Sequence, residues 1–150
     1  MSVEVRRAGS EEDLEGALAV RREVFVDEQG VSVEEEIDGR DAEAAHVVAV
    51  DEGGRVVGTC RVLPAGEGAM RIGRMAVVRG LRGSGAGAAL LAEAERVVTD
   101  LGAAEAVLDA QLTAQGFYER AGYHAEGGVF LDAGIEHVRM RRRLADRPAP

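Results

Sequence analysis

The sequence predicts an α+β fold, a three-layer α/β sandwich in which helices flank a mixed, mostly antiparallel sheet of about seven strands. Three observations predict it. Short apolar or alternating segments recur along the 150 residues and are separated by turns that contain glycine. Glycine pairs such as Gly53-Gly54 join neighbouring segments as hairpins, which pair strands antiparallel. One helical segment lies between two strands behind a glycine-rich loop, which predicts a single parallel pair with a right-handed crossover.

The first third of the chain is expected to form one strand and one long helix. Val3–Arg6 alternates as a strand does. Ser10 is a suitable cap for a helix with an acidic first turn, and apolar residues at helical spacing continue to Gln29-Gly30, where glycine favours the end of a helix. The acidic segment that follows, Ser32–Glu43, is expected to be a solvated loop.

The rest of the chain predicts three strands, a helix, a strand, a helix and two strands. These segments are, in order, Ala45–Asp51, Arg55–Leu63, Ala69–Val78, Ala88–Leu101, Ala104–Ala110, Leu112–Arg120, Tyr123–Phe130 and Ile135–Arg143. The length suits one domain over residues 1–146, and the proline-containing end at 147–150 is expected to be a disordered tail.

The composition narrows the class of partner. A net charge of −9 is unfavourable for nucleic acid and would steer a cationic or amine-bearing substrate inward. No apolar run reaches the roughly 18 residues of a membrane span, and the N-terminus lacks the apolar core of a signal peptide. Cys60 is the only cysteine, so no internal disulfide and no cysteine-based metal site can form. We therefore expect a cytoplasmic protein with no metal and no membrane partner.

The segment Arg82–Gly87 carries the strongest functional signal. Its glycines, at positions 83, 85 and 87, allow a tight turn that exposes main-chain N–H groups. The helix that follows adds the partial positive charge of its N-terminus. The segment therefore predicts an anion cradle for a phosphate or pyrophosphate.

Two other phosphate-binding loops fit this segment poorly. A Walker loop needs a lysine, and all 18 basic residues of the chain are arginine. The Rossmann loop of a dinucleotide-dependent oxidoreductase is matched loosely by Gly83, Gly85 and Ala88, with Asp109 at the separation of a ribose contact. However, residues 79–82 separate the strand from Gly83, and too little chain follows Asp109 to complete a doubly wound sheet.

A second motif favours a third interpretation. Arg82, Gly85 and Gly87 resemble the (Gln/Arg)-x-x-Gly-x-(Gly/Ala) pyrophosphate loop of the GNAT family of N-acetyltransferases. Residues 111–123 resemble that family's Asn-x-x-Ala-x-x-(Leu/Phe)-Tyr-x-x-x-Gly-(Phe/Tyr) motif, with Gln111 in place of the usual Asn. The two motifs have the separation found in the family. The resemblance implies the GNAT fold, in which the sheet is splayed between strands four and five.

The resemblance extends to a subgroup of that family and covers nearly the whole chain. The segments that resemble the bacterial ElaA/YjcF-like proteins are Glu23–Val31, Glu36–Asp38 with Asp41, His46, and Gly134–His137. The physiological substrates of this subgroup are poorly defined, so the closer match sharpens the expected fold more than the expected reaction.

The resemblance implies that acetyl-CoA binds as co-substrate where strands four and five separate. The implied cofactor-binding residues are Met75, Ala76, Val77, Arg82, Gly83, Ser84, Gly85, Ala86, Gly87, Gln111, Phe117 and Tyr118. N–H groups of residues 82–87 would hold the pyrophosphate, and residues 75–77 would pair with the pantetheine arm and polarise the thioester carbonyl. A primary amine, on a small molecule or a protein, would attack the thioester directly, with Tyr118 as the general acid.

The general base is left open at this point. The candidates are Glu28, Glu36, Asp38, His46 and His137, and we take Glu28 and His46 as the base or as substrate-side residues. A second class of function also remains: a non-catalytic sensor or subunit of the same fold that only binds acyl-CoA. Tyr118 favours the enzyme over this alternative. The last two strands are a candidate surface for a homodimer.

Overall fold

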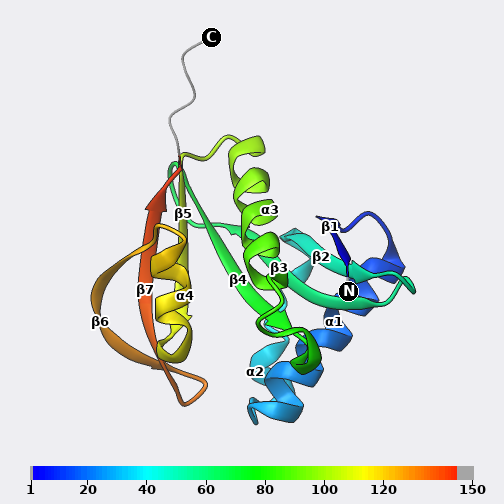
Figure 1. The fold of residues 1–150 in the computed structure, drawn as a ribbon. Helices are drawn as coiled ribbons and strands as arrows, with labels where there is room; N and C mark the ends of the chain where they lie inside the picture. Colours follow the sequence, from blue (N-terminus) through cyan, green and yellow to red (C-terminus); the bar gives the residue numbers. More distant parts are fainter. Residues whose placement is uncertain (1, 145–150) are drawn as a thin grey trace.

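A seven-stranded sheet lies between two layers of helices in the computed structural model, which describes residues 2–144 (Figure 1). The strands are β1 (Val3–Arg7), β2 (Ala45–Asp51), β3 (Val56–Pro64), β4 (Ala69–Val77), β5 (Glu105–Gln111), β6 (His124–Asp132) and β7 (Ile135–Arg143). Their order in the sheet is β1-β2-β3-β4-β5-β7-β6, and only β4 and β5 pair in parallel. The predicted fold class is therefore confirmed. The tail expected at 147–150 lies outside the described residues.

The helices lie on both faces of the sheet. They are α1 (Glu11–Arg21), the π-helix η1 (Arg22–Glu28), α2 (Val33–Glu36), α3 (Ala86–Asp100) and α4 (Gln115–Arg120), with 3₁₀ turns η2 (Asp41–Glu43), η3 (Arg79–Leu81) and η4 (Leu112–Ala114). The mixed sheet with one parallel pair rules out the doubly wound sheet that a Rossmann oxidoreductase requires.

Alternation along the central strands builds two cores. On β2, Val47 and Ala49 face the core beneath α3, whereas Val48 and Val50 face the core beneath α1. The α3 core also takes in apolar residues of β5, β7 and α4, so α3 and α4 cover one face of the sheet and α1 covers the other (Figure 1). The strands between these layers are buried on both sides.

The first helix begins and ends where the sequence predicts, but its winding changes from an α-helix to a π-helix within that range. The N–H of Asp13 donates to Ser10 Oγ at 3.1 Å, which caps α1. From residue 22 onward the chain winds as a π-helix, a form that is rare and often occurs at functional sites. Gly30, with φ of +75°, follows this wider helix. No local pattern in the sequence predicts this change in winding.

Three other sequence expectations need correction. The acidic segment 32–43 is not a simple solvated loop, because it forms α2 and η2 and buries Glu36. The helix after the glycine loop begins at Ala86, two residues earlier than expected, because Gly85 with φ of +93° acts as its cap. The helix expected over 112–120 is a 3₁₀ turn followed by α4.

β4 and β5 pair over only three residues and then separate. The parallel ladder joins Ala69–Arg71 to Glu105–Val107 and goes no further. Figure 1 shows the two strands meeting at one end and diverging towards the other. Beyond Arg71, the edge of β4 that faces β5 therefore has main-chain groups free to pair with a ligand. The predicted splay between strands four and five is confirmed.

A bulge in β4 lies at the start of this separation. Thr59 pairs with Ala76 but Arg61 pairs with Gly73, so β4 carries one more residue than β3 in this interval. Arg74 lies within the bulge and has φ of +53°, the left-handed region that a residue with a side chain rarely occupies. The bulge lies in the part of β4 that no longer pairs with β5.

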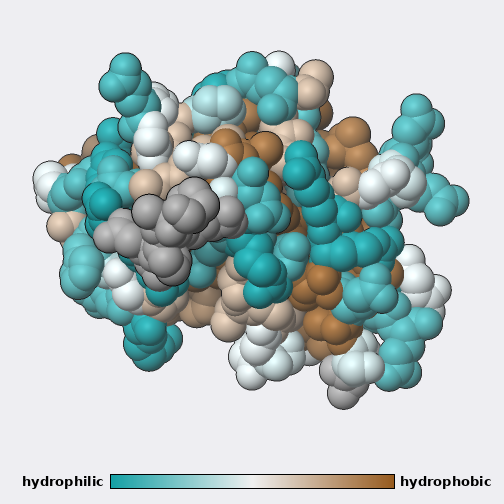
Figure 2. Space-filling model, turned by 90° about the horizontal axis from the view of Figure 1, so that it is seen from above, coloured by the Kyte–Doolittle hydropathy of each residue, from teal (hydrophilic) through white to brown (hydrophobic). Residues whose placement is uncertain are grey.

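The surface is mainly hydrophilic in the view of Figure 2, where hydrophobic residues show only in small groups. Among residues 2–144, no helix is both long enough and apolar enough to cross a membrane.

The close approach of α1 to β3 depends on Gly16. A Cβ at this position would lie 2.5 Å from Cγ2 of Val56 and 2.8 Å from its Cβ, and a β-branched valine cannot swing away. We expect Gly16→Ala to lower the free energy of unfolding by about 1–3 kcal/mol, although alanine is the better helix former. Denaturant unfolding measures this, with Gly9→Ala as control, because nothing lies within 4 Å of a Cβ there. A Gly16→Ala protein as stable as the native one would contradict this account of the packing.

Candidate active site

A cleft of about 500 Å³ opens where β4 and β5 diverge. Its walls come from η1, the segment after it, β4, β5, α4 and the turn between β6 and β7. Among the residues predicted for the site, those that line it are Glu36, Asp38, Met75, Gly87, Gln111, Phe117, Tyr118 and His137. The predicted residues that do not line it are Glu28, His46, Ala76, Val77 and residues 82–86.

The glycine loop presents its main chain towards a ligand. Gly83 and Gly85 have φ of +82° and +93°, so glycine is required at both turns. Gly85 leads directly into α3, whose first N–H groups have no acceptor within the helix. The dipole of this 15-residue helix adds partial positive charge at the same point. The residues present fit a pyrophosphate held by amide hydrogens.

The side chain of Arg82 holds the loop in place and does not extend over it. Its Nε donates to the carbonyl oxygen of Val77 at 3.0 Å, and its Nη2 donates to Glu28 Oε2 at 2.7 Å. Arg79 lies 3.8 Å from the same carboxylate. Glu28 thus links η1 to the glycine loop, while Gln29 and Val31 just after it reach the cleft.

Phe117 and Tyr118 connect the loop to the cleft. A Cβ on Gly87 would lie 3.6 Å from Cζ of Phe117, so the start of α3 and α4 are in close contact. The Phe117 and Tyr118 rings meet edge to face with centroids 4.9 Å apart. Tyr118 is 8% exposed, and burial raises the pKa of its phenol well above the ordinary value. The hydroxyl therefore keeps its proton and can donate a hydrogen bond into the cleft.

Gln111 ends β5 at the rim of the cleft. Its Nε2 donates to Gln29 Oε1 at 2.9 Å, which ties the end of β5 to the segment after η1. The longer glutamine side chain in place of the family's usual Asn therefore bridges the two walls of the cleft.

Three arginines and three carboxylates form a network along one wall of the cleft, which Glu36, Asp38, Arg61 and Arg74 line. Arg21 is 1% exposed, and its Nε and Nη2 donate to the two carboxylate oxygens of Glu36 at 2.9 and 3.1 Å. Its Nη1 donates to Asp41 Oδ1 at 2.6 Å. Arg61 binds Asp38 and also donates to the same oxygen of Asp41 at 2.9 Å. The charges in this network cancel, as burial requires.

Arg74 joins this network from the bulge of β4. Its Nε donates to Glu36 Oε2 at 2.8 Å, and its Nη2 donates to the carbonyl oxygen of Glu36 at 3.1 Å. The ion pairs explain the titration of two carboxyls: hydrogen bonds from Arg61 lower the pKa of Asp38, and Arg21 and Arg61 lower that of Asp41 against the effect of burial. Both groups are therefore weak proton acceptors at neutral pH.

The three histidines occupy different environments. The Nε2 of His46 lies 2.9 Å from the carbonyl oxygen of Asp41, and its Nδ1 is buried without a hydrogen-bond partner among residues 2–144. His124 is exposed on β6. His137 is the histidine that lines the cleft. The structure thus separates His46 and Glu28 from the cleft and brings His137 into it.

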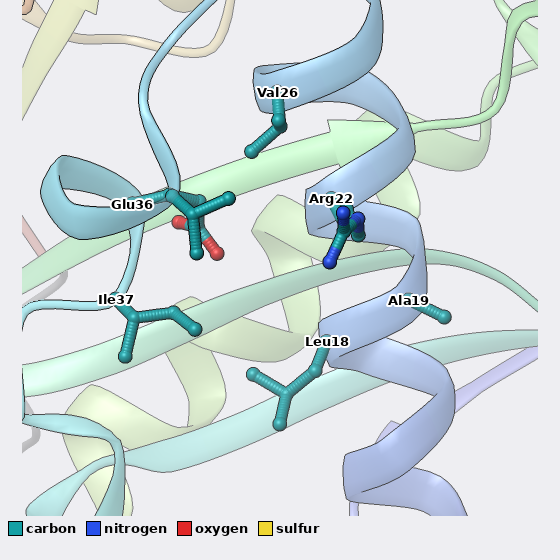
Figure 3. A pocket seen from close by; sticks show the side chains of 7 residues that line it. Leu18, Ala19, Arg22, Val26, Glu36 and Ile37 are labelled. Atoms are coloured by element: carbon teal, nitrogen blue, oxygen red, sulfur yellow. The ribbon is translucent and has the colours of Figure 1, made fainter.

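A second hollow, of about 250 Å³, lies between α1–η1 and α2 (Figure 3). Figure 3 shows the side chains of Leu18, Val26 and Ile37 around it, with Glu36 on the α2 side. Glu36 lines both this hollow and the cleft. α2 is consequently attached to the sheet mainly through the charges of Glu36 and its arginines, since apolar packing beneath it is incomplete.

The remaining points concern Cys60 and the possibility of a metal site. Cys60 is buried, and burial raises the pKa of its thiol to about 12, as suits a core residue. In the chain from residue 2 to residue 144, no group of three His, Cys, Asp or Glu side chains is placed to hold a metal ion.

The comparison with known proteins agrees with this geometry. Residues 6–144 match a family model described as an acetyltransferase (GNAT) domain. The chain belongs to the GNAT acetyltransferase family. It is 39% identical over 136 residues to the uncharacterised N-acetyltransferase YjcF of Bacillus subtilis (strain 168), a match that covers 90% of this chain and 96% of YjcF.

Two solved structures resemble this GNAT protein over nearly their full length. A proposed N-acetyltransferase from Lactobacillus plantarum has a TM-score of 0.89 and 31% identity, with 97% of this chain and 100% of the other covered. ElaA of Escherichia coli has a TM-score of 0.83 and 26% identity, with 95% and 100% covered. The predicted membership of the family is confirmed.

The buried charge network could not be found from charge patterning alone. One residue in the sequence did indicate a buried charge. Arg21 lies at helical spacing from Leu14, Leu18 and Phe25, so it is expected on the apolar face of the helix. A buried arginine needs a carboxylate, and the acidic segment 32–43 is the nearest source in the sequence.

Removing one charge from the network should be costly. We expect Glu36→Gln to lower the free energy of unfolding by about 3–5 kcal/mol, because it leaves the network with three arginines and two carboxylates and leaves Arg21 with Asp41 alone. The matched control is Glu43→Gln, which breaks the exposed Arg40–Glu43 pair and should cost less than about 1 kcal/mol. Urea unfolding of both variants measures the difference, and equal costs would show that the network contributes little to stability.

Proposed function

We propose that this GNAT protein is an acetyl-CoA-dependent N-acetyltransferase that moves an acetyl group to a primary amine by direct attack in a ternary complex. One observation carries the proposal: the last residue of the glycine loop, Gly87, the unpaired edge of β4 at Met75 and the buried Tyr118 line one cleft. Each of these features suits a different part of acetyl-CoA.

The main chain would bind most of the co-substrate. Within residues 82–87, the N–H groups of Gly83, Gly85 and Gly87 suit the pyrophosphate, whereas those of Arg82 and Ser84 donate to the carbonyl oxygens of Arg79 and Leu81. The side chain of Ser84 donates to the carbonyl oxygen of Leu81 and accepts from the N–H of Ala86, so it is turned away from that role. The edge of β4 at Met75–Val77 suits the pantetheine arm, because β5 no longer pairs with it. Phe117 and Gln111 border the same path.

Acetyl-CoA supplies a thioester, whose acyl carbon accepts the nitrogen of the amine. One of the N–H groups of Met75–Val77 would donate to the thioester oxygen as negative charge develops there. The C–N bond forms, the C–S bond breaks and its electron pair goes to sulfur. Tyr118 donates its hydroxyl proton to that sulfur and regains a proton from solvent, while the nitrogen releases one proton to solvent.

The pKa of Tyr118 refines this role. Because burial raises it, complete transfer of the proton to a thiolate is less favourable than for an exposed phenol. Tyr118 therefore acts mainly by hydrogen bonding to the sulfur as charge develops, and full transfer comes late.

The charge of the chain favours an amine over an acidic acceptor. Glu35 and Asp132 line the cleft from its two sides, and the net charge of the chain is −9. These groups favour polyamines, aminoglycosides, amino sugars or protein amines as the acceptor class.

Calorimetry and a thiol-release assay test the proposal. We expect acetyl-CoA to bind and NAD not to bind, and we expect release of CoA with at least one amine among spermidine, kanamycin, glucosamine and a lysine peptide. Absence of acetyl-CoA binding would refute the proposal. Binding without turnover of any amine would favour the non-catalytic acyl-CoA sensor.

A pair of tyrosine variants tests the acid. We expect Tyr118→Phe to lower kcat about 100-fold with little change in the affinity for acetyl-CoA, because the hydroxyl acts on the leaving sulfur. Tyr123→Phe is the matched control: Tyr123 donates to Glu95 at 2.9 Å outside the cleft, so its loss should reduce stability and leave kcat near the native value. Full turnover by Tyr118→Phe would show that another group serves the thiolate.

A further inference from the structure

We infer that Nε2 of His137 accepts the proton that the ammonium form of the substrate must lose before it attacks. This inference rests on the proposed function and adds the proton acceptor to it. In the step, an N–H bond of the ammonium breaks, the proton passes to Nε2, and the electron pair stays on nitrogen for attack on the thioester. His137 becomes imidazolium and returns its proton to solvent.

The orientation of the ring follows from one hydrogen bond. Nδ1 of His137 lies 2.7 Å from the carbonyl oxygen of Ile135. A carbonyl oxygen can only accept, so Nδ1 must carry the hydrogen. In the neutral ring Nε2 then has a free lone pair. The main chain thus selects the tautomer in which Nε2 is the basic nitrogen.

The turn between β6 and β7 makes that bond possible. Asp132 pairs with Ile135 across a two-residue turn, and both turn residues have positive φ: Ala133 at +51° and Gly134 at +75°. This is the geometry of the tight hairpin turn that suits twisted strands. It is strained at Ala133, which has a side chain. The turn fixes the start of β7, and with it the Ile135 carbonyl that holds His137.

Packing fixes the ring itself. His137 is 8% exposed and stacks on Phe130, with ring centroids 5.8 Å apart and planes inclined by 24°. Phe130 is its partner across the hairpin. On the other side His137 pairs with Gln111 of β5, so it lies on the strand face that carries the rim of the cleft. The ring can therefore act on a substrate without first losing rotational freedom.

The charged neighbours do not compete for this role. On the same face, the ionisable groups nearest in register are Asp109 of β5, Arg139 of β7 and its β6 partner Glu126, with Asp132 in the turn, and Glu105 and Arg141 lie further along the strands. Asp109 accepts from Arg71 at 2.9 Å and from Arg139 at 3.1 Å, so its charge is matched. The segment after η1 contributes the neutral Gln29 at this rim, and α4 contributes Tyr118, which keeps its proton.

Other candidate bases are less suitable. Glu36 and Asp38 line the cleft but are bound by arginines, and a carboxylate is a weaker base than an imidazole near neutral pH. Glu28 and His46 lie outside the cleft lining. His137 is thus the one group in the described cleft that combines a basic lone pair with a fixed direction.

The tautomer can be tested without any substrate. In ¹⁵N NMR of the histidine rings at a pH where they are neutral, we expect His137 to show hydrogen on Nδ1. His46, whose Nε2 faces the Asp41 carbonyl, should show hydrogen on Nε2. A His137 ring with hydrogen on Nε2 would overturn the inference, because no lone pair would then point to the substrate.

Two substitutions separate catalysis from structure. His137→Asn keeps an amide N–H near the position of Nδ1 for Ile135 and removes Nε2. We expect it to lower kcat/KM about 100-fold for spermidine, while calorimetry shows native affinity for acetyl-CoA. His124→Gln, at an exposed site on β6, should be indistinguishable from the native enzyme. A His137→Asn enzyme with native kcat/KM would overturn the inference.

The pH dependence of the rate distinguishes a proton acceptor from a residue that only supports the structure, because only loss of a proton acceptor changes the shape of the profile. The native rate should fall towards acid pH, because protonated Nε2 cannot accept. The His137→Asn rate should instead rise about tenfold per pH unit until the amine itself is deprotonated, so the variant approaches the native rate at high pH. Parallel profiles would overturn the inference. If native protein neither binds acetyl-CoA nor releases CoA, the proposed function fails first.

Discussion

The cleft depends on an ion pair between the bulge of β4 and the short helix α2. Arg74 holds a left-handed backbone conformation that costs of order 1–3 kcal/mol for a residue with a side chain. Such a conformation persists only where its surroundings hold it, and Glu36 does so by accepting from Nε at 2.8 Å. The same carboxylate binds Arg21 of α1. One side chain thus fixes the bulge in the unpaired part of β4 and the helix that borders the opening.

Charge takes the place of apolar packing on this side of the sheet. The hollow beneath α2 shows that apolar contact there is loose, whereas the hydrogen bonds of Arg21, Arg61 and Arg74 are short and directed. Apolar surfaces tolerate sliding, but paired guanidinium and carboxylate groups do not. The network therefore sets the position of α2 over the cleft. Its main contribution is to fix this position, and its net contribution to the free energy of unfolding is smaller.

Local signals made most of the fold predictable from the sequence. Alternation, hairpin turns and the Ser10 cap are read from neighbouring residues, and so are the glycine turns at 83 and 85. The charge network was missed because its arginines lie at positions 21, 61 and 74, far apart in the sequence. A run of carboxylates favours solvent when read alone, and burial follows only from the pairing of distant elements. The π-helix likewise has no local signature here.

The assignment of a proton acceptor shows why the candidate site was harder to predict than the fold. Whether a strand residue reaches the cleft depends on register, and the pairing of His137 with Gln111 is a tertiary fact. Register also separates the two groups to which we assign proton transfer. Tyr118 belongs to the core beneath α3, while His137 lies on the strand face opposite Val138 and Met140 of that core. If the two side chains met, the phenol would donate to the imidazole and neither would be free for substrate. Because the splayed sheet lies between them, the donor can act on the sulfur and the acceptor on the amine.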